Sequence, residues 1–372
     1  MKRMRWVFTF VVALIFTTAW AQPQQVDWKA FEDETMQHFQ SLLRLETMDP
    51  PGNEKPAADY LKQVLEKEGI ATKTFALEPN RPNVVAHLKG SGEKRPLLIM
   101  AHTDVVNVDP KKWTYPPFSA TRNGGYVYGR GTVDDKDNVT AALMTVLTLK
   151  RQNVPLNRDV IFLFESGEEG ATRVGIQFMV NQHFTEIDSE FCLAEGGGVV
   201  RQRGQVPRHA SMLRTSISPN EFNAGYRINV IPSEAKALLD VRTLPDEDAA
   251  KFLEQVKKVI NDPAVEAAWT ARDVRPGSSV ARLDSEAFKA LETNVTKHYK
   301  APLLPTMGTG ATDMAYLRGK GIQCYGIGPA TDMEDGPLGF GAHSDQERIL
   351  ESEILRFSRF NLDVVLDLVR AK

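Results

Sequence analysis

Several short runs in this chain are apolar at consecutive positions rather than at every second position, and this pattern constrains the fold most. Examples are "LLIMA" at 97–101, "VIFLF" at 160–164 and "FCLA" at 191–194. A strand that is covered on both faces can be apolar throughout, whereas a half-exposed strand alternates. Stretches with helical periodicity, such as 27–48 and 137–153, lie between these runs. The sequence therefore predicts an α/β fold, with a mostly parallel mixed sheet covered by helices on both faces.

The pattern changes after residue 205. Residues 220–232 and 233–245 alternate better and predict two adjacent strands, 246–262 predict an amphipathic helix, and 265–274 predict a third strand. From residue 283 the pattern seen before residue 205 resumes. It includes a helix capped by an aspartate and, at 346–371, a long terminal helix. We therefore expect a catalytic domain over 22–205 and 277–372, interrupted by a small inserted α+β domain, the lid, over 206–276.

The N-terminus has the composition of a secretory signal. A basic segment, "MKRMR", precedes an apolar run at 6–16, and "TTAWA" ends in an Ala-x-Ala pattern. We expect cleavage after Ala21 and a periplasmic or secreted protein. A membrane anchor is the alternative, but the apolar run is short for a span, so no stable anchor is expected after cleavage.

Composition narrows the class of protein further. The formal net charge of −3 gives no support for a nucleic-acid partner, because proteins that bind nucleic acids usually carry an excess of basic residues. The two cysteines, Cys192 and Cys324, lie in apolar runs and are expected to be small buried hydrophobes. A single disulfide between them is left open by the sequence.

Histidine and acidic residues follow the apolar runs at the point where each predicted strand ends. These residues are His102, Asp104, Asp134, Asp135, Glu168, Glu169 and Glu195, and His343 lies on a loop before the last helix. Ligands of open α/β sheets bind at the carboxyl ends of the strands, so we expect these side chains to share one crevice. Taken singly, each has an ordinary explanation, such as a satisfied polar residue, a helix cap or a solvated face.

The set as a whole favours a metal site. Imidazole and carboxylate groups suit Zn²⁺ or a similar first-row ion. A single catalytic ion uses three protein ligands and a water, so this larger set fits two ions that share a carboxylate.

The chain resembles a family of zinc metallopeptidases that includes aminoacylase, succinyl-diaminopimelate desuccinylase, carnosinase and bacterial glutamate carboxypeptidase. The matching motifs follow the family order over almost the whole chain after residue 21; they are "LLIMAHTDVV", "YGRGTVDDKDNVTAAL", "FLFESGEEG", "LAEGGG", "NVIPSEAKALLDVR", "GTGATDMAYL" and "HSDQERI".

The resemblance implies a role for each strand-end residue. It implies that His102, Asp134 and Glu195 hold one zinc ion, and that Asp134 bridges to a second ion held by Glu169 and His343. Glu168 is implied as the general base that takes a proton from a water between the ions. Asp104 is implied to orient the imidazole of His102. In this family the bond between the residues matching Asp134 and Asp135 is often cis.

The resemblance also implies substrate contacts. Arg242 matches an arginine that grips a substrate carboxylate, Asn229 matches a polar lid residue, and Thr312 matches a loop at the carboxylate end of the pocket. A guanidinium suits bidentate recognition of a carboxylate. An ordinary arginine on a strand is the alternative for Arg242.

The lid departs from the family pattern. Only 18 residues lie between Glu195 and Arg214, where the family has a strand, a helix and a Gly-His-Ser-like motif. The histidine of that motif polarises the scissile carbonyl. Among the histidines outside the expected metal ligands, His209 comes closest to the motif, but it lacks the preceding glycine and the helix that should follow. The missing part also supplies much of the dimer surface, so a homodimer is doubtful.

We therefore expect a di-zinc hydrolase, with cobalt or manganese as alternative metals. Its substrate would be a small peptide or an N-acyl amino acid, cleaved at an amide bond next to a free carboxylate. The alternative is a catalytically impaired or non-catalytic metal-binding protein, because half of the lid is missing. A related aminopeptidase is disfavoured because that group lacks the lid.

Overall fold

A computed structural model describes residues 26–201, 215–244, 247–270, 275, 280–306, 308, 310–332 and 334–371. The expected signal segment, its cleavage site after Ala21, and His209 lie outside the described residues.

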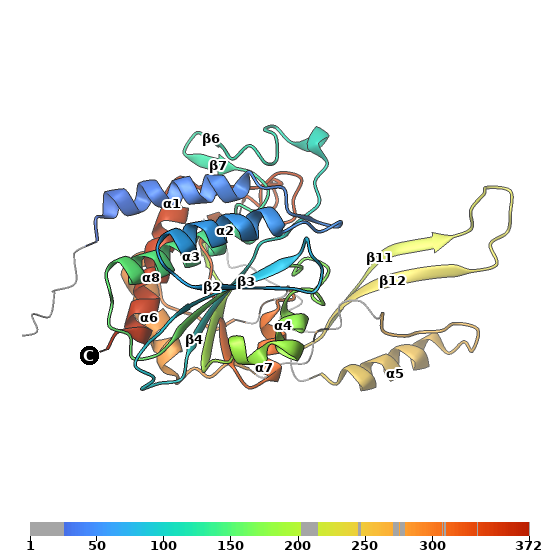
Figure 1. The fold of residues 1–372 in the computed structure, drawn as a ribbon. Helices are drawn as coiled ribbons and strands as arrows, with labels where there is room; N and C mark the ends of the chain where they lie inside the picture. The colour runs from blue at the N-terminus through green and yellow to red at the C-terminus, as the bar shows by residue number, and fades with distance from the viewer. Residues whose placement is uncertain are drawn as a thin grey trace, which may run out of the picture.

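The chain is organised around a six-stranded mixed sheet (Figure 1). Its strands in spatial order are β13 (Gln323–Gly326), β9 (Phe191–Ala194), β4 (Leu97–His102), β8 (Val160–Glu165), β3 (Pro82–Leu88) and β2 (Thr72–Ala76). Strands β13, β9, β4 and β8 are parallel, and β3 and β2 continue the sheet in antiparallel fashion. The carboxyl ends of the parallel strands therefore meet at one edge.

Both faces of this sheet are covered, which explains the unbroken apolar runs. Successive residues point to opposite faces of a strand. On β4, Leu97 and Ile99 pack into the core that includes residues of α2, α3, α6 and α8, while Leu98 and Met100 pack against α4 and α7. The helices are α1 (Trp28–Leu43), α2 (Lys55–Lys67), α3 (Lys136–Arg151), α4 (Ile176–Gln182), α6 (Glu286–Tyr299), α7 (Met314–Gly319) and α8 (Glu351–Val369). The predicted α/β fold is confirmed.

Short strands outside the main sheet join the loops around its carboxyl edge. They are β1 (Met48–Asp49) with β5 (Val105–Val106), β10 (Val199–Arg201) with β14 (Ala330–Asp332), and the three strands β15 (Arg348–Leu350), β7 (Tyr126–Tyr128) and β6 (Thr121–Asn123). Two 3₁₀ turns, Pro110–Lys112 and Phe184–Glu186, complete the connections.

The two cysteines face one another across β9 and β13. Cys192 and Cys324 are partners in the parallel register, and both are buried and free. Both lie in the core beneath α4 and α7, so they pack as the small hydrophobes that the sequence predicts.

The lid is simpler than predicted. Strands β11 (Ser216–Ala224) and β12 (Ala235–Arg242) form an antiparallel ribbon that extends away from the main sheet, followed by α5 (Ala249–Ile260) (Figure 1). The prediction of a strand over 265–274 is wrong for 265–270, which is irregular. Trp269 instead stacks on Phe252 of α5, with ring centroids 6.3 Å apart, so this apolar stretch packs on the helix.

Three predicted element boundaries also need correction. The terminal helix begins at Glu351 rather than at 346, because Arg348–Leu350 form β15. Strand β11 ends at Ala224, because Gly225 takes a positive φ of 69° and starts the loop that contains "NVIP". The cap of α6 is Ser285 rather than Asp284, since its Oγ accepts a hydrogen bond from the backbone N of Phe288 at 3.0 Å.

Among the described residues, no helix is both long enough and apolar enough to cross a membrane.

Candidate metal centre

Five predicted site residues converge at the carboxyl edge of the sheet. His102 ends β4, Glu195 follows β9 and Glu169 lies in the turn after β8. Asp134 precedes α3, and His343 lies on the loop before β15. These residues form two groups of three, His102–Asp134–Glu195 and Asp134–Glu169–His343, and in each group the ligand atoms lie within 4.8 Å of one another. The two groups share Asp134.

The distances give each oxygen of Asp134 a different partner. The Nε2 atom of His102 lies 3.1 Å from Oδ1 of Asp134, and Nε2 of His343 lies 3.0 Å from Oδ2. Glu195 approaches His102 at 4.0 Å, and Glu169 approaches His343 at 3.0 Å. Two imidazoles and three carboxylates fit a pair of first-row divalent cations with a bridging carboxylate.

The electrostatics of these groups reflect their crowding. Hydrogen bonds to Asp134 and Glu169 raise the pKa of His343 to about 10. Burial raises the pKa of Glu195 to about 7. A ligand must be deprotonated to bind a metal, so protons and cations compete for the same lone pairs here.

Asp104 does more than the sequence predicts. Its carboxylate accepts hydrogen bonds from three successive backbone N–H groups, those of Gly167 (2.9 Å), Glu168 (3.2 Å) and Glu169 (2.9 Å). The Nδ1 atom of His102 lies 3.5 Å from Oδ1 of Asp104 and 3.0 Å from its backbone oxygen. The buried carboxylate therefore fixes the turn that carries both glutamates, in addition to its contact with His102.

The turn itself depends on a glycine. Gly167 has a positive φ of 81°, and a Cβ added there would lie 2.6 Å from the backbone oxygen of Ala171. This tight turn sets Glu168 and Glu169 at the end of β8, where the backbone is held by Asp104.

Asp135 fixes the backbone of a candidate ligand. Its Oδ2 accepts a hydrogen bond from the backbone N of His102 at 3.1 Å, and its Oδ1 accepts from Asn138 at 2.6 Å. The Asp134–Asp135 peptide bond is cis, as the resemblance implies.

A buried ion pair that the sequence reading missed joins the loops of Asp134 and His343. Glu347 accepts hydrogen bonds from Arg130 (2.8 Å) and from the backbone N of Val133 (2.7 Å), while Arg130 also donates to the backbone oxygen of Ser344 at 2.7 Å. The sequence indicates this ion pair only through the position of Glu347, an acidic residue four positions after His343.

The three predicted substrate residues lie in three different parts of the structure. Thr312 lies beside Glu195, and its proximity acts to lower the pKa of Glu195 against the effect of burial. Arg242 lies on β12 and pairs with Asp240 at 3.0 Å. Asn229 belongs to the loop between β11 and β12, at the end of the ribbon that points away from the sheet (Figure 1). The structure therefore brings Thr312 to the centre and leaves Asn229 remote from it.

A third acidic group is explained without a cation. Asp49 and Glu54 lie near Asp104, but both pair with the buried guanidinium of Arg81, at 2.8 Å and 2.5 Å. The guanidinium of Arg81 hydrogen-bonds to both Asp49 and Glu54, so this group is better described as a buried ion-pair cluster than as a metal site.

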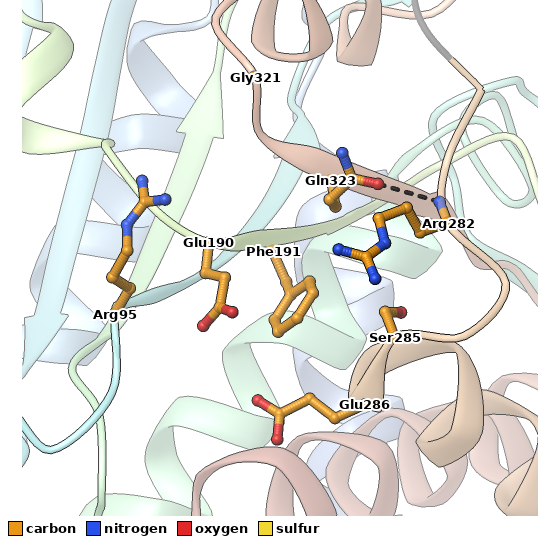
Figure 2. Close-up of a pocket in the computed structure, with 8 residues that line it drawn as sticks. All are labelled: Arg95, Glu190, Phe191, Arg282, Ser285, Glu286, Gly321 and Gln323. Atoms are coloured by element: carbon orange, nitrogen blue, oxygen red, sulfur yellow. Dashed lines mark hydrogen bonds between the residues drawn. The ribbon is translucent and has the colours of Figure 1, made fainter.

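A cavity of about 380 Å³ lies at the opposite edge of the sheet, where β9 and β13 begin (Figure 2). Charged side chains line it, but they pair with neighbours: Arg95 with Asp188, Arg282 with Asp284, and Glu190 and Glu286 with the buried Arg158. Because these charges are already matched, the cavity is a less convincing ligand site than the unbalanced cluster at the carboxyl edge.

Comparisons with known proteins agree with this architecture. The family model described as Peptidase family M20/M25/M40 matches residues 98–367. N-formyl-4-amino-5-aminomethyl-2-methylpyrimidine deformylase of Halalkalibacterium halodurans is 32% identical over 257 residues, which cover 66% of this chain and 55% of the relative. This chain thus spans about half the length of that relative. Aminoacylase-1B of Rattus norvegicus is 24% identical over 393 residues, covering 90% and 94%.

Solved structures show the same fold. An M20 family metallo-carboxypeptidase from Sulfolobus solfataricus superposes with a TM-score of 0.75 at 19% identity, covering 90% of this chain and 98% of that one. A dinuclear metal binding peptidase of the M20 family from Bacillus subtilis gives a TM-score of 0.64 at 17% identity, covering 92% and 99%.

Proposed function

This chain belongs to peptidase family M20/M25/M40 and is a hydrolase of amide or peptide bonds; we propose that the bond it cleaves lies next to a free carboxylate, in a small peptide or an N-acyl amino acid. The observation that carries this proposal is the pair of ligand groups that share Asp134, with Glu168 directly beside the candidate ligand Glu169. Relatives named deformylase and aminoacylase support an amide substrate.

The family is metal-dependent, and we assign the metal ligands from the donor set. His102, Asp134 and Glu195 would hold one ion, and Asp134, Glu169 and His343 a second, with zinc expected and cobalt or manganese as alternatives. When bound, the ions would supply Lewis-acid polarisation of the scissile carbonyl and a more acidic water.

Glu168 is assigned as the general base. Its backbone is fixed by Asp104 and its side chain is buried beside the ligand cluster. A carboxylate in this position would accept a proton from the attacking water and pass it to the leaving nitrogen. Asp104 and Asp135 would act by holding the residues that do the chemistry.

The substrate carboxylate would be recognised by residues around the rim of the centre. Thr312 lies beside Glu195 and offers a hydroxyl. The guanidinium of Arg242 is suited to a carboxylate but would have to approach from the lid ribbon, as would Asn229. We also propose export to the periplasm or the medium, with cleavage after Ala21, which N-terminal sequencing of the mature protein would test.

Metal analysis and a substrate panel test the proposal together. The panel contains dipeptides, N-acyl and N-formyl compounds, and matched amides that lack the free carboxylate. We expect about two ions per chain, metal-dependent hydrolysis, and a preference for substrates with the free carboxylate.

Glu168→Gln provides the mechanistic control. It should retain the metal and reduce kcat by at least about 10²-fold, the size of effect typical of a general base. Glu292→Gln, an exposed glutamate on α6, is the matched control and should leave the activity unchanged. Full metal content without hydrolysis of any panel member would favour a non-catalytic protein, and activity that survives Glu168→Gln would refute the assigned base.

A further inference from the structure

A guanidinium that the roles assigned above do not use lies against the candidate base. Arg275 belongs to the segment between α5 and α6, where the chain returns from the lid. Its Nη2 atom lies 2.5 Å from Oε1 of Glu168 and also donates to the backbone oxygen of Glu168 at 3.1 Å. The arginine therefore contacts both the side chain and the main chain of the same residue.

A second carboxylate holds the other side of this guanidinium. The Nε and Nη2 atoms of Arg275 lie 3.3 Å from Oδ1 of Asp313 at the start of α7, and the side chain of Asp313 is 1% exposed. The planar fork of arginine thus links a carboxylate on the turn after β8 to a fixed carboxylate on another element. With Arg275 itself only 17% exposed, water competes weakly for these contacts.

The contact with Arg275 fixes the side chain of Glu168, which Asp104 does not. Asp104 fixes the backbone of Glu168, but a glutamate side chain still has free rotations beyond Cα. Catalytic groups must be held closely in their productive geometry by neighbours that are themselves fixed. Arg275 binds Oε1, which leaves Oε2 to receive the proton.

We propose that Arg275 is a positioning residue that orients the carboxylate of Glu168 toward the metal ligands, with Asp313 as its anchor. The inference rests on the proposed function, because it assigns Arg275 to the base of that reaction. It places a residue from the lid junction in direct contact with the base.

Kinetics of Arg275→Ala in the full-length, metal-loaded protein test this role. Since Arg275 contacts the base, we expect kcat to fall by about 10²-fold, the contribution of a general base, while KM and metal content stay near the wild-type values. Arg275→Lys should recover only part of kcat, because an ammonium is a point charge without the planar fork. Added guanidinium should partly restore kcat of Arg275→Ala.

The double variant Glu168→Gln/Arg275→Ala separates action through the base from an independent role. We expect it to be no slower than Glu168→Gln alone, because residues that act as a unit are not additive. An additional loss would overturn the proposal, as would unchanged kcat in Arg275→Ala, or an increase in KM alone, which would indicate a substrate contact. Arg282→Ala, an exposed arginine on the same return segment, is the matched control.

A crystal structure of Arg275→Ala gives a readout without turnover. The carboxylate of Glu168 should rotate away from its wild-type position, and a carboxylate that stays in place would overturn the proposal. The two hypotheses fail differently. If the wild-type protein hydrolyses no panel member, the proposed function fails, whereas if the wild type is active, Glu168→Gln is inactive and Arg275→Ala is fully active, only the positioning role fails.

Discussion

The carboxylate of Asp104 accepts a hydrogen bond from the backbone N–H of Glu169 at 2.9 Å, so the end of β4 is tied to the turn after β8. Both strands deliver a candidate metal ligand, His102 and Glu169, to the same edge of the sheet. Asp104 has no exposed surface and cannot exchange this contact for water. Besides the pairing of β4 with β8, one buried side chain therefore fixes the turn that carries Glu169 relative to His102.

Asp104→Asn should weaken the metal centre. The amide would turn one NH₂ group toward backbone N–H donors, so at least one buried donor would lose its acceptor, at a cost of about 1–3 kcal/mol in the free energy of unfolding. The affinity for metal should fall by about 10–100-fold. Denaturant unfolding and metal titration measure the two effects. Asp33→Asn, at an exposed site on α1, is the control, and equal metal affinity in both variants would contradict the prediction.

His343→Ala should remove one metal ion and cost little stability. The His343 side chain is 56% exposed, whereas that of His102 is 1% exposed. The ion content should fall from about two to about one per chain, and the melting temperature of the metal-free protein should fall only slightly, because the His343 side chain that pairs with Asp134 and Glu169 is more than half exposed. Metal analysis and thermal unfolding check this, with His87→Ala on β3 as the control. A variant that still binds both ions would exclude His343 as a ligand.

Glu347→Gln should disturb two candidate ligands that it does not touch. Glu347 is fully buried and accepts hydrogen bonds from Arg130 and from the backbone N–H groups of Gly131 and Val133, just before Asp134. An amide nitrogen cannot accept from these donors, so we expect a loss of about 1–3 kcal/mol in stability. Metal binding should weaken as well. Calorimetric metal titration measures this, with Glu292→Gln as the control, and unaltered binding would show that the loops are held by other contacts.

The sequence predicts what depends on local order and misses what depends on how loops meet. His102 ends β4, Glu169 lies in the turn after β8 and Glu195 follows β9, so the topology of a parallel sheet brings them together. Their roles stay predictions. Arg275 and Glu347 lie in loops whose partners are distant in sequence, and no spacing rule connects them to the site. In the lid, Trp269 stacks on Phe252, so the apolar pattern of 265–270 reflects packing on α5 rather than the strand that the sequence predicts.

Acid should weaken the contact between three helices at Arg151. This arginine at the end of α3 pairs with Glu34 on α1 and with Glu68 just after α2. The contacts with His38 at 3.5 Å and with Arg151 lower the pKa of Glu34 from 4.5 to about 2. The folded pKa lies below the unfolded one, so the stabilisation is present above about pH 4.5 and is lost as the pH falls toward about 2.

Glu34→Gln should therefore reduce the free energy of unfolding near neutral pH by about 1 kcal/mol or less, since the pair is partly exposed. The difference from the wild type should shrink as the pH is lowered and as salt is added. Urea unfolding at several pH values measures it. A difference that grows in acid would contradict the assigned ion pair.

The lid ribbon should promote self-association. Strands β11 and β12 form a two-stranded sheet, and Phe222 and Ile231 are 73% and 93% exposed on it and its loop. Exposed apolar side chains on an open strand pair favour association with other chains. The variant Phe222→Ser/Ile231→Ser should shift the protein toward monomer at high concentration, as measured by light scattering. Leu77→Ser, an exposed leucine next to β2, is the control and should have no effect. Association that persists unchanged in the double variant would show that the ribbon is not the contact.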